Sequence, residues 1–282
     1  MSDIKTGGPA RWHHAAAMPN RLTEHALQQS RSFGVRRIPA LRPLGWLARG
    51  WRDLMACPLP GLLHGAVMAA FGAALFWQAR HQFWWLAGAF SGYLLVAPVL
   101  ATGLYAVSRA IERGEPAGLR TALAAWRPRD HRLVVFGGLL ALAGAGWVLT
   151  SASLIVSALP GQVNRPVDFL RLVVLAEHGL LFETWLVLGA LLAAPVFASS
   201  VVALPMLLDR SIGVLGAVFT SWRAVMEHPI PMALWAVLLL VLTGLGMATL
   251  LLGLVVVLPW LAHASWHAYR DLVLAHDDRE RG

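Results

Sequence analysis

The chain has 282 residues, of which 57% are hydrophobic and only 13% are charged, and it contains 13 tryptophans. Its mean hydropathy of +0.61 is far above that of ordinary soluble domains, which excludes a soluble globular protein. The formal net charge of +8 comes almost entirely from arginines that flank apolar runs. This pattern is typical of membrane orientation, so we expect a lipid-embedded protein with no nucleic-acid partner.

The chain begins and ends with polar segments. Residues 1–42 are rich in arginine and interrupted by prolines, and they lack the apolar core of a cleaved signal peptide. This composition predicts a mostly disordered N-terminal tail in the cytoplasm. Residues 274–282 are predicted to form a polar C-terminal tail, which leaves residues 43–273 as one polytopic helical membrane domain.

Long apolar runs within this domain predict an all-α membrane protein with about six transmembrane helices. A helix needs about 20 apolar residues to cross the roughly 30 Å hydrocarbon layer, and these runs are continuous rather than alternating. The predicted spans are Leu59–Trp77, Phe83–Val107, Leu133–Leu159, Leu180–Met206, Ile230–Gly246 and Ala248 to about Ala268. The last two are short together, so one long helix followed by a surface helix is an alternative.

The basic residues predict the orientation of these helices. With six spans, 20 lysines and arginines lie on the side of the N-terminal tail and three on the other side. With five spans the division is 17 to six. The positive-inside rule therefore predicts that both termini are cytoplasmic.

A repeated motif precedes three of the predicted spans. The segments GWLARGWRDLMACPLP, LRTALAAWRPRD and VLGAVFTSWRAVMEHPIP each end an amphipathic run in a Trp–Arg pair that is followed by a proline. The pairs are Trp51 and Arg52, Trp126 and Arg127, and Trp222 and Arg223. The pattern predicts three amphipathic interfacial helices, with tryptophans in the headgroup region and arginines that contact anionic lipid.

A second repeated element surrounds Pro98, Pro195 and Pro259. When these prolines are aligned, Tyr105 and Arg109 coincide with Trp266 and Arg270, whereas the middle copy departs from the pattern. The repeats predict three parallel helical hairpins around an axis along the membrane normal, with units of about 43–109, 115–206 and 211–273. The prolines are predicted helix kinks, which serve either packing or a binding site.

Two histidines on the last span, His263 and His267, raise the question of a metal or haem site. Their spacing places them on one helix face, but a single pair supplies too few ligands. Trp266, Tyr269 and Arg270 beside them instead predict an interfacial anchor, with Asp271 in solvent. We therefore expect no metal and no cofactor.

Other features indicate little enzymatic chemistry. No carboxylate lies in the middle of a span, and the acidic residues beside the spans are predicted to be solvated helix ends. They are Glu177, Glu183, Asp209 and Asp271. The sequence has no phosphate-binding loop, nucleophile elbow or dinucleotide fingerprint, so we expect a protein that is not an enzyme. Gly61 with Gly65 and Gly88 with Gly92 predict close helix packing within the chain.

Several stretches resemble an uncharacterised bacterial family of predicted integral membrane proteins, the domain of unknown function 2189. They are SVVALPMLLDRSIGVLGAVFTSWRAVMEHPIPMALW, GLVVVLPWLAHASWHAYRDL and GLYAVSRAIERGEP, and the resemblance covers about 38–273. It implies location in a bacterial inner membrane. Some members carry the label of cytochrome c oxidase components, but only His64, His263 and His267 lie in the predicted spans, too few for a catalytic oxidase subunit.

Three functions are therefore compatible with the sequence. The first is a non-catalytic membrane component that binds lipid or protein, with unknown membrane-protein partners. The second is a small-solute transporter or channel that uses the helices bent at proline. The third is an accessory protein that handles haem or metal through His263 and His267.

Overall fold

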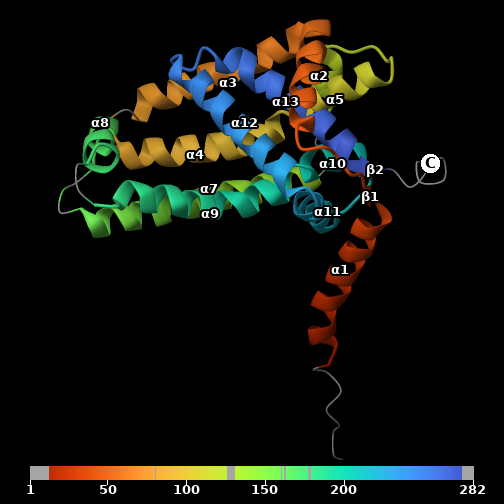
Figure 1. The fold of residues 1–282 in the computed structure, drawn as a ribbon, viewed down its shortest axis with the longest axis horizontal. Coiled ribbons are helices and arrows are strands. Elements are labelled where there is room, and N and C mark those ends of the chain that lie inside the picture. Colours follow the sequence, from red (N-terminus) through yellow and green to blue (C-terminus); the bar gives the residue numbers. More distant parts are fainter. Residues whose placement is uncertain are drawn as a thin grey trace, which may run out of the picture.

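The computed structural model describes residues 13–79, 81–125, 131–159, 161, 163–176 and 179–274, and its architecture is all-helical apart from one short strand pairing (Figure 1). Four of the described helices are long and apolar enough to cross a membrane. They are Pro58–Gln78, His131–Ala158, Leu181–Asp209 and Pro229–Ala248. The prediction of a helical membrane protein is confirmed in this form.

The first repeat unit forms a surface helix followed by a helical hairpin. Its elements are α2 (Arg42–Ala56), α3 (Pro58–Ala79), α4 (Phe83–Leu100) and α5 (Thr102–Glu112). Pro58 begins α3 because proline is pre-organised for the first turn of a helix and lacks only an N–H that would be unpaired there. Ala101, three residues after Pro98, separates α4 from α5.

The second unit has the same order, with an insertion at the far end of the bundle. Its elements are α6 (Leu119–Ala124), α7 (His131–Ala158), α8 (Pro166–Phe169), a π-helix (Leu170–Val174), α9 (Leu181–Ser200) and α10 (Ala203–Asp209). The helix again breaks after its proline, since α9 ends five residues beyond Pro195. The π-helix lies next to α8 at the left of Figure 1.

The third unit settles whether the last apolar run is one helix or two. It folds as α11 (Val214–Glu227), α12 (Pro229–Ala248) and α13 (Leu254–Leu272). Between α12 and α13, Leu250 and Leu251 have φ angles of 55° and 70°, in the left-handed region that ends a helix. The apolar run therefore folds as two helices, of which α12 is one of the four candidate membrane spans among the described residues and α13 is not. Helix α13 continues through Pro259 without a break.

The N-terminal segment is more ordered than its composition predicts. Residues 13–42 were predicted to be a disordered tail, but they contain α1 (His13–Ser32) and β1 (Gly34–Val35). Strand β1 pairs antiparallel with β2 (Val273–Leu274), and the Arg36 amide donates to the carbonyl of Leu272. Backbone pairing with the other end of the chain thus fixes this segment. Residues 1–12 and 275–282 of the two predicted tails lie outside the described residues.

Helix α1 contacts the molecule only near its C-terminal end. It packs against α11, where the Gln29 side-chain oxygen accepts a hydrogen bond from the Gly213 amide at 3.3 Å. A Cβ atom at Gly216 would lie 2.7 Å from the same oxygen, so a glycine permits this close approach. The rest of α1 extends away from the bundle (Figure 1).

The helices pack in a cyclic order. Helix α2 packs on α13, α6 on α5, and α11 on α9 and α10, so each surface helix contacts the last helix of the preceding unit. Helices α5, α10 and α13, which end the three units, also contact one another. Their C-terminal ends therefore meet at one end of the bundle, which is the right-hand side of Figure 1.

Apolar side chains cover the outside of the long helices. Val134 on α7, Leu191 on α9 and Leu240 on α12 are each about two-thirds exposed or more. Two fully buried tryptophans, Trp46 and Trp235, lie in the core, with ring centroids 5.5 Å apart. An apolar exterior on this scale is what contact with lipid requires.

Candidate functional site

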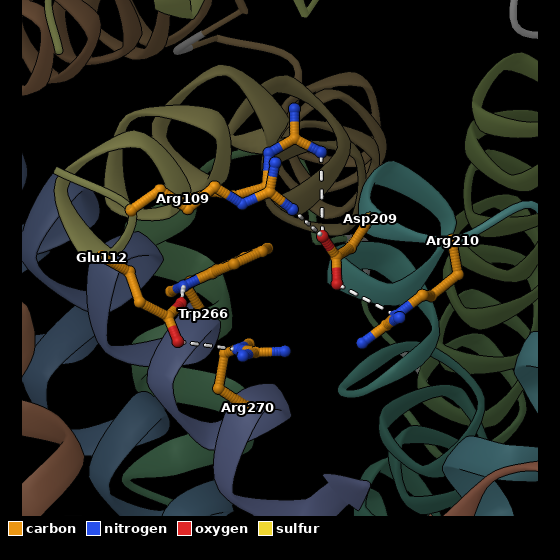
Figure 2. A pocket seen from close by; sticks show the side chains of 7 residues that line it. Arg109, Glu112, Asp209, Arg210, Trp266 and Arg270 are labelled. Carbon is orange, nitrogen blue, oxygen red and sulfur yellow. Dashed lines mark hydrogen bonds and ion pairs between the residues drawn. The ribbon is translucent and has the colours of Figure 1, made fainter. Parts of the chain in front are cut away.

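A charged cavity lies where α5, α10 and α13 meet (Figure 2). Its volume is about 300 Å³, and it opens at the end of the bundle where these three helices terminate. It is lined by Arg109, Glu112, Arg113, Asp209, Arg210, Trp266 and Arg270. We call it the axis cavity, because each of the three repeat units contributes to its wall.

Asp209 forms one acidic centre of the axis cavity. Its carboxylate lies 3.8 Å from Arg109, 3.6 Å from Arg113 and 3.2 Å from Arg210, and its side chain is only 4% exposed. The Tyr269 hydroxyl also donates to Asp209 Oδ2 at 2.8 Å. Burial, followed by the Asp209 charge, raises the pKa of Tyr269, so this hydroxyl remains a proton donor at neutral pH. The prediction that Asp209 is a solvated helix end is wrong.

Glu112 forms the second acidic centre. It accepts hydrogen bonds from Arg270 Nε at 2.9 Å and from Trp266 Nε1 at 3.0 Å. Burial lowers the pKa of Arg270, but the bond and charge of Glu112 outweigh burial and leave this pKa raised. Trp266 and Tyr269 are each 1% exposed. The predicted interfacial anchor is therefore wrong for the rings of Trp266 and Tyr269, which are buried within the protein, whereas Arg270 pairs with Glu112 at the wall of the cavity.

The residues that line the axis cavity recur at equivalent positions in the repeat units of the sequence. Arg109 and Arg270 each lie eleven residues after the proline of their unit. Arg113 and Arg210 each lie fifteen residues after theirs, and Glu112 and Asp209 fourteen. The middle unit departs at the first of these positions, where Met206 is fully buried. This repetition is the signal by which the sequence could have shown the cavity, because equivalent residues converge when units pack around one axis.

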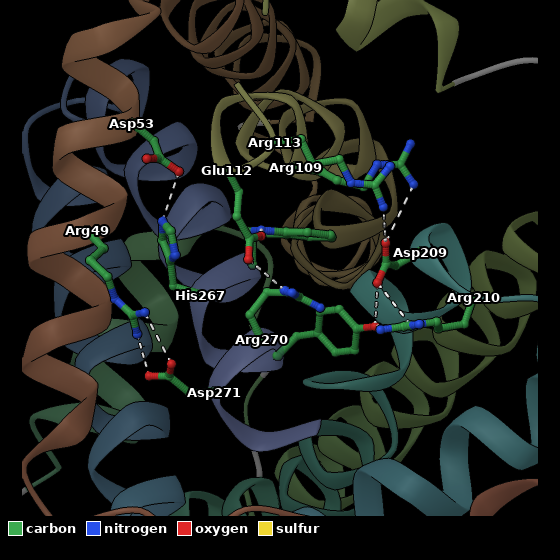
Figure 3. A network of polar contacts seen from close by, with 12 residues as sticks. Arg49, Asp53, Arg109, Glu112, Arg113, Asp209, Arg210, His267, Arg270 and Asp271 are labelled. Carbon is green, nitrogen blue, oxygen red and sulfur yellow. Dashed lines mark hydrogen bonds and ion pairs between the residues drawn. The ribbon is translucent and has the colours of Figure 1, made fainter. Parts of the chain in front are cut away.

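Outside the axis cavity, the carboxylate of Asp271 joins α13 to α2 (Figure 3). It accepts from Arg42 Nε at 2.6 Å and from Trp46 Nε1 at 2.8 Å, and Arg49 binds both of its oxygens. Burial alone would raise the pKa of Asp271, but these bonds outweigh it and lower the pKa to about 2. Asp271 is 6% exposed, so the prediction that it lies in solvent is wrong.

The two histidines of α13 enter a buried network with α2 and α5. Ser108 donates to Asp53 Oδ2 at 2.6 Å, and His267 Nε2 contacts the same oxygen at 2.9 Å. A hydroxyl has one hydrogen, so His263 Nδ1, 2.8 Å from Ser108 Oγ, must be the donor in that pair. Burial would raise the pKa of Asp53, but the bonds from His267 and Ser108 outweigh it and lower the pKa.

This network uses one ring nitrogen of each histidine. His263 and His267 share a helix face, as the sequence predicts, but they bond to Ser108 and Asp53 instead of pointing at one common centre. His263 Nε2 is buried without a hydrogen-bond partner among the described residues. Within the same part of the chain, no three histidine, cysteine or acidic side chains gather as metal ligands would.

The predicted lipid-contact residues fall into different environments. Arg52 is exposed, and Trp51 is 40% exposed with its ring centroid 5.4 Å from that of Trp260. Trp222 is 39% exposed and donates to Ser199 at 2.9 Å. Arg223 donates to the Phe33 carbonyl and lies 3.6 Å from Glu227. Arg109 and Arg270 line the axis cavity, and Trp126 and Arg127 lie outside the described residues.

Neither Pro195 nor Pro259 is among the described residues that line this cavity. The helix is interrupted after Pro98 and after Pro195 but not after Pro259, and the side chain of Pro98 is outside the description. The axis cavity begins eleven residues beyond them, about three helical turns away. The cavity expected of a transporter at the level of the prolines is thus distinct from the one described here.

Comparison with known proteins gives a family match for the middle of the chain. Residues 85–209, from α4 to the end of α10, match the family described as "Predicted integral membrane protein (DUF2189)". This match is narrower than the 38–273 over which the sequence resembles the family. No curated protein and no solved structure matches the chain. Residues 85–209 are thus similar to the DUF2189 family of predicted integral membrane proteins, and this match together with the four long apolar helices identifies the chain as an integral membrane protein.

Proposed function

We propose that the protein resides in a bacterial inner membrane and crosses it six times as three parallel hairpins, with both termini in the cytoplasm. Four long apolar helices support this topology, and α4 and α13 supply the remaining two crossings. The cyclic packing of the three units supports a common axis. The asymmetric distribution of 20 basic residues against three supports the orientation.

We further propose a non-enzymatic role in which the cytoplasmic end binds anionic lipid and thereby holds other membrane components. The main support for this role is that the charged side chains of α5, α10 and α13 gather where these helices end. Exposed Arg52 on α2 extends this basic surface. Arginines at the membrane surface attract anionic headgroups by about 1 kcal/mol each.

The environment of Ser108 supports the proposal that the protein is not an enzyme. Ser108, His263 and Asp53 include the residue types of a hydrolytic triad, but Ser108 is 0% exposed. Its hydroxyl proton points to a carboxylate rather than to the histidine, which is the wrong direction for activation as a nucleophile. We therefore assign this network to the packing of α2, α5 and α13.

The test compares two matched triple variants in native membranes. The first replaces Arg52, Arg127 and Arg223 by glutamine, and the second replaces Arg80, Arg165 and Arg171, which the sequence assigns to the opposite side of the membrane. After extraction in mild detergent, co-purified lipids are measured by mass spectrometry. We expect the first variant to lose anionic lipid relative to zwitterionic lipid and the second to retain it. Equal lipid content in the two variants and the wild type would contradict the proposal.

A further inference from the structure

We infer that the axis cavity is a specific binding site for a phosphate monoester, carried either by a lipid headgroup or by a soluble molecule. This inference deepens the proposed contact with anionic lipid and rests on the same end of the bundle. It replaces a diffuse basic surface with one defined site. The argument rests on the charge, the geometry and the position of the cavity.

The described residues that line the cavity carry a net positive charge. They include four arginines and the two carboxylates of Glu112 and Asp209, which gives these described residues a net charge of +2. An anion bound among these guanidinium groups would reduce the repulsion between them. A phosphate monoester carries about −1.5 to −2 charges at pH 7, whereas a phosphodiester carries one. The charge balance therefore favours the monoester.

The ion pairs of Arg109 and Arg113 leave these two side chains able to bind a ligand. Asp209 lies 3.8 Å from Arg109 and 3.6 Å from Arg113, longer than the roughly 2.7–2.9 Å of a close charge-assisted hydrogen bond. Arg113 has a side chain that is 54% exposed. Arg270 contacts Glu112 through Nε, the inner nitrogen of its guanidinium. The forked arrangement of guanidinium donors matches phosphate oxygens.

The volume and position of the cavity limit the ligand further. A volume of about 300 Å³ is at the lower end for small-molecule sites and suits a phosphate with a short polar substituent. The residues of the wall follow directly after the predicted spans, because Arg109 comes two residues after Val107 and Asp209 three after Met206. The cavity is thus at headgroup depth, where a lipid phosphate and a soluble phosphate both have access.

The experiment uses the full-length protein in a neutral detergent. Its thermal unfolding is followed with glycerol 3-phosphate, inorganic phosphate, phosphatidic acid or phosphatidylglycerol, each against sodium chloride at the same ionic strength. Arg113→Gln removes the most exposed arginine of the cavity. Arg120→Gln removes an exposed arginine of α6, which packs on α5 outside the cavity, and serves as the control.

We expect the monoesters to raise the unfolding temperature and to bind more tightly than phosphatidylglycerol. Arg113→Gln should weaken this binding about tenfold, which corresponds to the loss of one hydrogen bond to a charged group, and Arg120→Gln should leave it unchanged. Stabilisation by both glycerol 3-phosphate and phosphatidic acid assigns the phosphate group as the ligand. Stabilisation by phosphatidic acid alone assigns the lipid as its source.

Two results would overturn the inference. One is the absence of stabilisation by any monoester, and the other is an equal loss of binding in Arg113→Gln and Arg120→Gln. An equal loss indicates diffuse attraction, which leaves the proposed lipid contact intact and removes the specific site. Conversely, monoester binding in a protein that shows no preference for anionic lipid would remove the proposed function and retain the site.

Discussion

Asp271 is the residue on which the contact between α2 and α13 depends most directly. Replacing it with asparagine removes the charge that Arg42 and Arg49 share and weakens the acceptor for Trp46, which is fully buried. We expect Asp271→Asn to lower the free energy of unfolding by about 1–3 kcal/mol, less than for a fully buried pair because the arginines are partly exposed. Denaturant unfolding in detergent measures this.

Glu227→Gln is the control for Asp271→Asn. Glu227 is 47% exposed and pairs with Arg223 one turn away on the same helix. Such a surface pair contributes only about 0.3–0.5 kcal/mol. If the two variants were equally stable, the buried position of Asp271 would have no energetic significance.

The same carboxylate predicts a pH dependence. The pKa of Asp271 is about 2 in the folded protein, below its ordinary value, so unfolding takes up a proton in acid. Its stabilising contribution is complete above about pH 5 and is lost as the pH falls towards 2. Because solvent screens the arginines, we expect a loss of roughly 1–2 kcal/mol.

Unfolding curves recorded between pH 7 and pH 3 test this pH dependence. The acid-induced loss of stability should be smaller in Asp271→Asn than in the wild type. Asp53, whose pKa is also lowered, should leave the variant with some residual acid sensitivity of the same sign. Wild-type and variant curves that run parallel across this range would count against the assignment.

The sequence predicted which residues are chemically unusual better than it predicted where they lie. His263, His267 and Asp271 were identified from their spacing, but solvent and lipid were expected around them. Their actual partners are Ser108, Asp53 and Arg49, which are more than 150 positions away along the chain. Local periodicity indicates the face of a helix but not the side chains that another helix brings to it. Burial of charge at a helix end therefore could not be predicted from one segment.

Helix α3 packs on α13 through Gly65, where side-chain volume decides the distance between the helices. A Cβ atom at Gly65 would lie 2.1 Å from the Val255 carbonyl oxygen, whereas at Gly92 on α4 it would meet no atom within 4 Å. The predicted intramolecular packing is confirmed at Gly65, and the structure shows no such close approach at Gly92. The two glycines thus provide a matched pair for substitution.

Alanine substitutions at these two glycines should have opposite effects. In Gly65→Ala the added methyl group must push the backbone of α3 away from that of α13. We expect this variant to destabilise the protein by about 1–3 kcal/mol, because overpacking outweighs the better helix propensity of alanine. Gly92→Ala should be neutral or stabilising by up to about 1 kcal/mol. Thermal unfolding of both variants in one detergent measures the difference. A stabilising Gly65→Ala would show that the helices separate freely.

Apolar length predicted the helices well because it is a local property. The expected spans beginning at Leu59, Phe83 and Leu133 begin within two residues of α3, α4 and α7. The N-terminal segment was predicted incorrectly because its order comes from pairing between Gly34 and Leu274, at the other end of the chain. A polar composition predicts disorder only where no distant strand supplies hydrogen bonds.

The molecule as a whole is polarised, with basic residues concentrated at one end of the helix bundle. Moving arginines across a bilayer is costly during insertion, so loops with many of them remain in the cytoplasm. This asymmetry predicts that Arg120, before α7, faces the cytoplasm, and that Arg171, in the π-helix, faces the opposite side. Both side chains are exposed, which makes them suitable positions for labelling.

Cysteine labelling in cells tests this orientation. Cys57 is the single cysteine, so Cys57→Ser provides an unreactive background for Arg120→Cys and Arg171→Cys. A membrane-impermeant maleimide should label Arg171→Cys in intact cells with a permeabilised outer membrane and Arg120→Cys only after lysis. Labelling of both positions before lysis would place the two loops on the same side of the membrane and exclude the single crossing that we assign to α7 between them. The reverse pattern would place the axis cavity outside the cytoplasm, where cytoplasmic phosphate monoesters have no access.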